Sequence, residues 1–165
     1  MCFVLYMAAD ALIPDIPFDT NAPALNTQPI SDRESPLQDI FHQRNVKFLG
    51  SSNHCGCGYR HLSYQNGEWP EEYLIDTATE FGAETQADHE SLHRFMVQQL
   101  QHNDNDKIEL YGCWDGDFQH PPTRHEMIAV AELIRRDFFL RERCHYTVTL
   151  QAPSETTEQQ PAAQT

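Results

Sequence analysis

Basic residues are scarce in this sequence. It contains 11 Lys and Arg against 25 Asp and Glu, which gives a formal net charge of -14. A negative field of this size repels phosphate backbones and anionic membrane surfaces. We therefore expect neither nucleic acid nor a membrane as a partner. A basic protein is the kind of partner that an acidic face would attract.

Long apolar runs, glycine and a secretion signal are also lacking. No stretch reaches the ~18 apolar residues of a membrane span, and the apolar residues 2–9 carry neither a basic segment nor a cleavage site. The sequence has 7 glycines and neither a Gly-x-x-x-x-Gly-Lys nor a Gly-x-Ser-x-Gly pattern, which argues against a phosphate loop and a nucleophile elbow. Its 5 cysteines, without a secretion signal, indicate free or metal-bound thiols in a reducing compartment. We therefore expect a cytoplasmic protein.

Apolar runs of strand length predict a β-sheet. Residues 3–9 form a continuous apolar run, which is typical of a central strand covered on both faces. Residues 46–51, 108–114 and 145–150 have the pattern of further strands. Residues 59–64 are expected to return as the hairpin partner of 46–51. Prolines among polar residues predict a surface excursion over residues 10–32.

Capping signals predict helices between these strands. A short helix is expected to begin at Ser35, with Pro36 at its first helical position. A longer one begins at Thr85 and ends before the Asn-Asp segment 103–106, and a third covers residues 123–138. This order indicates a single α/β or α+β domain, residues 1–150, with about three helices packed on a mixed sheet of about five strands. Residues 151–165 are expected to be a disordered tail.

The densest chemistry follows the strand at residues 46–51. Cys55 and Cys57 flank one glycine, and His54 precedes them. These soft ligands suit zinc or a redox thiol pair, and Cys113, at the end of another strand, is the best remote candidate to complete a metal site. The alternative is a turn built by glycines with positive φ, in which the cysteines are small buried hydrophobic residues.

A second turn carries carboxylates. Asp115 and Asp117 follow the strand at 108–114, where they could hold a hard cation, although an Asp-Gly turn is also an ordinary way to leave a strand. The two turns converge if this strand runs parallel to residues 46–51, and otherwise they lie at opposite edges.

The residues of the two turns resemble those of a group of other proteins. Gly50-Ser51, the segment from Cys55 to Tyr59 and the segment from Cys113 to Asp117 resemble a set of uncharacterised bacterial proteins of similar length. The resemblance covers most of residues 1–150, and it implies no activity and no site residues.

The segment His89-Glu90-Ser91-Leu92-His93 matches the H-E-x-x-H pattern. On a helix, His89 and His93 would grip zinc while Glu90 activates its water for hydrolysis. No third ligand follows at a recognisable spacing, so solvated or core-edge histidines are favoured. Cys2 would become an N-terminal nucleophile if Met1 were removed, but it leads into a buried strand, which disfavours that role.

Three hypotheses about function follow from the sequence. The first is a thiolate site at Cys55 and Cys57, joined by His54 or Cys113, that binds zinc or changes redox state. The second is a non-enzymatic module whose acidic face docks a basic protein. The third is a zinc-dependent hydrolase that uses the H-E-x-x-H segment.

Overall fold

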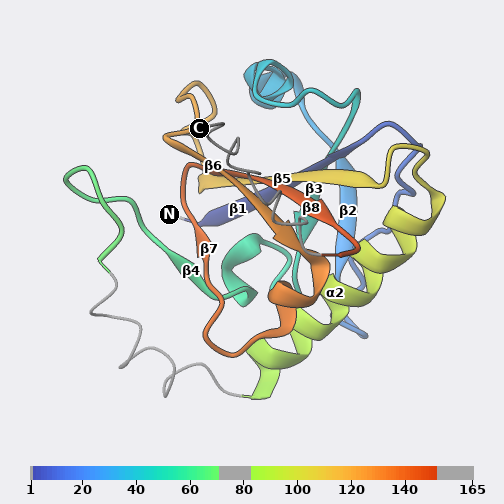
Figure 1. Cartoon of the computed structure of the whole chain (residues 1–165). Coiled ribbons are helices and arrows are strands. Elements are labelled where there is room, and N and C mark those ends of the chain that lie inside the picture. The colour runs from blue at the N-terminus through green and yellow to red at the C-terminus, as the bar shows by residue number, and fades with distance from the viewer. Residues whose placement is uncertain (1, 71–82, 152–165) are drawn as a thin grey trace, which may run out of the picture.

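A six-stranded mixed sheet forms the centre of the computed structural model, which describes residues 2–70 and 83–151. The spatial order of its strands is β2-β3-β1-β5-β8-β6 (Figure 1). The strands are β1 (Phe3–Ala9), β2 (Asn26–Pro29), β3 (Asn45–Gly50), β5 (Lys107–Trp114), β6 (Arg124–Ala129) and β8 (Cys144–Thr149). A separate two-stranded sheet pairs β4 (His61–Leu62) with β7 (Leu140–Arg141).

β1 occupies the interior of the large sheet. All seven of its residues are buried, which confirms the prediction of a central strand. It pairs antiparallel with β3 on one side and with β5 on the other, so that Tyr6 lies opposite both Phe48 and Tyr111. Since both neighbours run against β1, they run parallel to each other.

Each face of the sheet is covered by a different element. The helix α2 (Ala83–His102) packs on one face, and the 3-10 helix η1 (Asp32–Asp39) lies on the other (Figure 1). Alternate residues of β1 divide between the two cores, because successive side chains of a strand point to opposite faces. Phe3 and Leu5 belong to the core beneath α2, whereas Val4 and Tyr6 pack with Leu37 of η1.

The predicted mixed sheet and the long helix are confirmed. α2 begins two residues before Thr85 and ends at His102, next to the predicted breaker. The third predicted helix, over residues 123–138, is wrong. Residues 124–129 form the edge strand β6, parallel to β8, and the 3-10 helix η3 (Val130–Ile134) follows.

Thr123 and Glu126 do not cap a helix as predicted, because their polar groups have other partners. The amide and hydroxyl of Thr123 donate to the carbonyl oxygen of Arg143, at 2.8 and 3.2 Å. The carboxylate of Glu126 pairs with Arg124 and Arg141 instead of turning back to the cap. Six residues of pairing with β8 outweigh the local helical preference.

The predicted hairpin between residues 46–51 and 59–64 is also wrong. β4 pairs in parallel with β7, so this part of the chain leaves β3 instead of returning along it. Tyr59 is fully buried beneath the sheet, and its hydroxyl donates to the carbonyl oxygen of Gly50 at 3.0 Å. Burial of this large ring therefore draws the chain under the sheet.

Two smaller differences concern residues 10–39. The predicted excursion contains β2, a short edge strand that ends on Pro29, which an edge position tolerates. The predicted short helix exists, but it is a 3-10 helix that begins at Asp32, where the amide of Ser31 donates to the carboxylate of Glu34 at 2.7 Å. The structure has one α-helix in its described ranges, where three packed helices were expected. The predicted tail lies outside the described residues except for Gln151.

Candidate metal centre

The thiol turn and the acidic turn meet at one edge of the sheet. β3 and β5 run parallel, so their carboxyl ends, which lead into the two turns, point the same way. β1 begins between them, and the amide of Asp115 donates to the carbonyl oxygen of Cys2 at 2.9 Å. The sequence predicts that the two turns converge if these two strands run parallel, and the strands do run parallel.

Ser51 organises the thiol turn. Its side chain is buried, and its hydroxyl donates to the carbonyl oxygen of Cys55 at 2.7 Å. The Oγ of Ser51 also accepts hydrogen bonds from the amides of Asn53 and Gly58, at 3.2 and 3.1 Å. One hydroxyl thus fixes both ends of the turn.

The glycines of the turn serve close packing and not positive φ, which corrects the expectation from sequence. A Cβ atom at Gly58 would lie 2.3 Å from the hydroxyl of Ser51 and 2.4 Å from a carboxylate oxygen of Asp88. At Gly56 it would lie 3.0 Å from the carbonyl oxygen of Phe3. The left-handed residue of the turn is His54, with φ of 66°.

Three thiols come together at this edge. The Sγ atoms of Cys2, Cys55 and Cys57 lie within 4.8 Å of one another, and these residues could hold a metal ion. Sulfur ligands of a tetrahedral zinc ion, with Zn–S bonds of about 2.3 Å, lie about 3.8 Å apart, so a small movement of the side chains suffices. Cys2 is exposed, which leaves one side of the group open to solvent.

The surroundings of Cys55 and Cys57 differ. The amide of Cys57 donates to the Sγ of Cys55 at 3.3 Å. Burial, followed by the hydrogen bond with Cys55, raises the pKa of the Cys57 thiol to about 12. A thiol of this kind is a poor redox nucleophile, because the reactive form is the thiolate.

The structure does not bring His54 or Cys113 into this group. The ring of His54 stacks on Phe18 with a centroid distance of 4.4 Å, and its Nε2 lies 3.0 Å from Nε2 of Gln28. Cys113 is buried in the core on the η1 face. Sequence reasoning missed Cys2 as a partner, since its position beside the turn depends on the direction of β1.

The acidic turn has partners of its own. Asp115 pairs with Arg33 at 3.7 Å, and Asp117 pairs with Nδ1 of His120 at 3.1 Å. Gly116 has φ of 103°, the conformation that an Asp-Gly turn requires. These ion pairs and the conformation of Gly116 therefore explain the segment as an ordinary turn at the end of β5.

The H-E-x-x-H segment has a structural role in the fold. His89 is fully buried; its Nδ1 lies 2.7 Å from the carbonyl oxygen of Leu133, and its Nε2 accepts the amide of Arg60 at 2.8 Å. Both ring nitrogens are thus engaged, which leaves no lone pair for zinc. Glu90 is exposed and His93 is half-buried.

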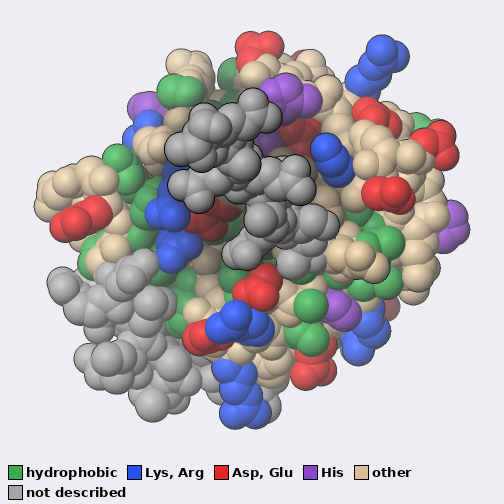
Figure 2. Space-filling view, viewed as in Figure 1, with side chains coloured by type: hydrophobic (Ala, Val, Ile, Leu, Met, Phe, Trp, Pro, Cys, Tyr) green, Lys and Arg blue, Asp and Glu red, His purple; other side chains and the backbone are tan. Residues whose placement is uncertain are grey.

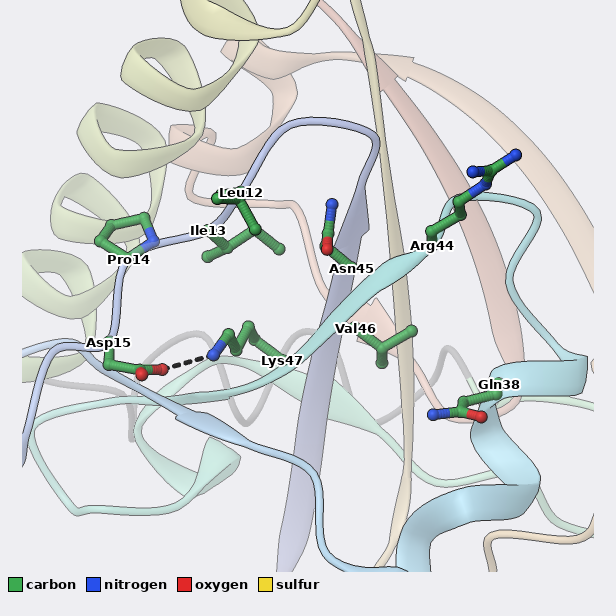
Figure 3. A pocket seen from close by; sticks show the side chains of 9 residues that line it. All are labelled: Leu12, Ile13, Pro14, Asp15, Gln38, Arg44, Asn45, Val46 and Lys47. Atoms are coloured by element: carbon green, nitrogen blue, oxygen red, sulfur yellow. Dashed lines mark hydrogen bonds and ion pairs between the residues drawn. The ribbon is translucent and has the colours of Figure 1, made fainter.

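Three further observations concern the surface and the helices. A hollow of about 650 Å³ is lined by residues 12–15, 38 and 44–47, where Lys47 pairs with Asp15, and it contains none of the three thiols (Figure 3). Acidic and basic side chains are interspersed over the face seen in Figure 2. Within the described ranges, no helix has the length and apolar character to cross a membrane.

Comparison with known proteins gave no match: no family model, no curated protein and no solved structure matches this chain.

We expect Ser51→Ala to loosen the thiol turn. Removing the hydroxyl leaves the buried amide of Gly58 unpaired, so the free energy of unfolding should fall by about 1–3 kcal/mol. Urea denaturation measures this change. The control is Ser91→Ala, whose hydroxyl accepts a hydrogen bond from Arg94 at the surface and whose loss should cost less than about 0.5 kcal/mol. Equal effects of the two changes would contradict the role given to Ser51.

We expect His89→Phe to be destabilising by about 2 kcal/mol or more, because it leaves the amide of Arg60 and the carbonyl of Leu133 unpaired. Burial, and then the charge of Arg60, lowers the pKa of His89 from 6.5 to about 4. The unfolded chain binds the proton first, so the wild type should lose stability as pH falls from about 6.5 to about 4.

Urea denaturation of the wild type and His89→Phe across this pH range checks both effects. His93→Ala, on the same helix, is the control and should keep the acid-sensitive component. An unchanged pH profile in His89→Phe would refute the assignment.

Proposed function

We propose that this protein binds a thiophilic metal ion, with zinc as the first choice, through Cys2, Cys55 and Cys57. The observation that carries the proposal is the meeting of three Sγ atoms within 4.8 Å at one edge of the sheet. Thiolates select zinc and copper(I) over harder cations. Three protein ligands leave a further position for water or another donor, as in zinc sites that are not closed.

Metal binding accounts for the thiols better than redox cycling does. The cluster has three sulfurs instead of a pair, and a disulfide ring with one intervening residue would be strained. The high pKa of Cys57 also opposes nucleophilic attack by its thiol, whereas a metal ion displaces the proton directly.

The other two hypotheses have less support. Zinc hydrolysis at the H-E-x-x-H segment conflicts with the two hydrogen bonds of the His89 ring. Docking of a basic protein would call for acidic side chains gathered on one face, and the one face that Figure 2 shows has side chains of both signs. A reducing compartment, as in the cytoplasm, would keep the three thiols available for metal.

Metal content of matched cysteine variants tests the proposal. The thiol cluster of the wild type should bind about one zinc ion per chain, and Cys57→Ser should lower the zinc affinity of this cluster by at least about tenfold, because a hydroxyl is a poor zinc ligand. The control is Cys113→Ala, which removes a buried thiol from the opposite face of the sheet. Equilibrium dialysis followed by elemental analysis gives both numbers.

Loss of zinc in Cys113→Ala, with Cys57→Ser unaffected, would overturn this assignment in favour of a site that includes Cys113. Failure of the wild type to bind zinc or copper(I) with a Kd below about 10 μM would refute the function itself.

The affinity should also depend on pH. Since the pKa of Cys57 is raised to about 12, its thiol is protonated at neutral pH and must lose this proton when the ion binds. The apparent affinity should therefore fall by about tenfold or more for each unit of pH decrease between about pH 8 and about pH 6. Isothermal titration in buffers of different ionisation enthalpy counts the protons released. An affinity that stays constant over this range would contradict thiol ligation.

A further inference from the structure

A second group of ligand atoms lies on the opposite face of the sheet. Glu109 belongs to β5 and His145 to β8, where His145 lies opposite Tyr111, two residues from Glu109. The two side chains are therefore diagonal neighbours on one face. His42, from the segment after η1, completes the group, and the ligand atoms of all three lie within 4.8 Å of one another.

Glu109 carries a buried charge without a Lys or Arg partner among its recorded ion pairs. It is 4% exposed, and its Oε2 accepts the amides of His42 and Gln43 at 3.0 and 2.8 Å. Its Oε1 lies 2.8 Å from Nδ1 of His42 and 3.0 Å from Nε2 of His145. The carboxylate thus lies against two imidazole nitrogens and two backbone amides, so a cation shared by Oε1 and the two imidazoles would find its ligand atoms already gathered.

His145 supplies an independent indication of a ligand. It is 2% exposed, and its buried Nε2 has no aligned hydrogen-bond partner, although Oε1 of Glu109 is close. Its Nδ1 lies 3.3 Å from Nδ1 of His125. When the Nδ1–H of His145 donates to His125, the lone pair of Nε2 points to a carboxylate oxygen, an arrangement that a cation between them would stabilise. Metal-bound histidines commonly donate their other ring N–H in this way.

We propose that His42, Glu109 and His145 form a second metal site, for a divalent first-row cation such as zinc or iron(II). Two imidazoles and one carboxylate are a ligand set that both ions accept with positions left open. Bonds of about 2.1 Å place neighbouring ligands of an octahedron about 3 Å apart. The two contacts of Oε1, at 2.8 and 3.0 Å, match this spacing.

The site opens toward a hollow of about 340 Å³ that His42 and Glu109 line together with Asp10, Asn105, Lys107 and Thr147. The side chain of His42 is 79% exposed, so water and small ligands reach this side of the group. The open positions of the ion would therefore face the hollow, with Lys107 placed to attract a small anionic ligand.

Binding of Co²⁺ separates this site from the thiol cluster, because thiolate ligands give an intense charge-transfer absorption that nitrogen and oxygen ligands do not. The background is Cys57→Ser, which lowers the affinity of the thiol cluster for metal by at least about tenfold. In that background we expect about one Co²⁺ per chain, bound without a sulfur charge-transfer band. Adding His42→Ala should weaken binding by at least about tenfold, whereas adding His102→Ala, which removes an exposed histidine of α2, should leave the affinity unchanged.

Because His42 is mainly exposed, its removal should leave the fold intact, as circular dichroism would show. The buried ligand is tested by His145→Gln, with the same readout. Absence of stoichiometric Co²⁺ in the Cys57→Ser background would overturn the site and leave an ion-paired carboxylate in its place. Equal Co²⁺ affinities of His42→Ala and His102→Ala in that background would also overturn the site. Neither result depends on the proposed thiolate function, which the charge-transfer band of the wild type reports separately.

Discussion

The antiparallel pairing of β1 with both β3 and β5 determines where the chemistry of this protein lies. A buried strand between two neighbours that run against it makes those neighbours parallel to each other. The carboxyl ends of β3 and β5 then flank the beginning of β1. Cys2 comes within reach of Cys55 and Cys57 for this reason, although more than fifty positions separate them in the sequence.

The alternation of side chains along the strands keeps the two ligand groups apart. Cys57 packs beside the core beneath α2, whereas Phe41, beside His145, belongs to the core on the η1 face. Glu109 lies near the beginning of β5, and the thiol edge lies at the end of that strand. One sheet thus carries a group of three sulfur atoms and a group of nitrogen and oxygen atoms that have no residue in common.

The sequence predicts those parts of the fold that local pattern decides. The apolar runs of β1, β3, β5 and β8 and the apolar stripe of α2 are recognisable in the sequence, and β1 and most of β5 are buried accordingly. β6 was mistaken for a helix because its ladder with β8 depends on residues twenty positions away. β2 was missed because an edge strand containing Asn26 and Pro29 has no apolar pattern to detect.

The same distinction between local pattern and long-range contacts applies to the candidate sites. Cys55 and Cys57 are visible in the sequence because they are neighbours, whereas Cys2 requires the strand direction. The group of His42, Glu109 and His145 requires the register of β5 against β8 and the path of the chain after η1. No spacing rule connects three residues from three separate segments.

The net charge of -14 also bears on how metal ions would approach these two groups. Docking of a basic protein requires acidic side chains gathered on one surface. The electrostatic field of the protein, in contrast, is the sum over all of its charges, wherever they lie. A strongly negative chain raises the local concentration of cations and lowers that of anions. Such a field favours the arrival of metal ions at both groups without selecting between them. Selection would then rest on the ligand atoms, since thiolates prefer soft ions whereas imidazole and carboxylate ligands also accept harder ones.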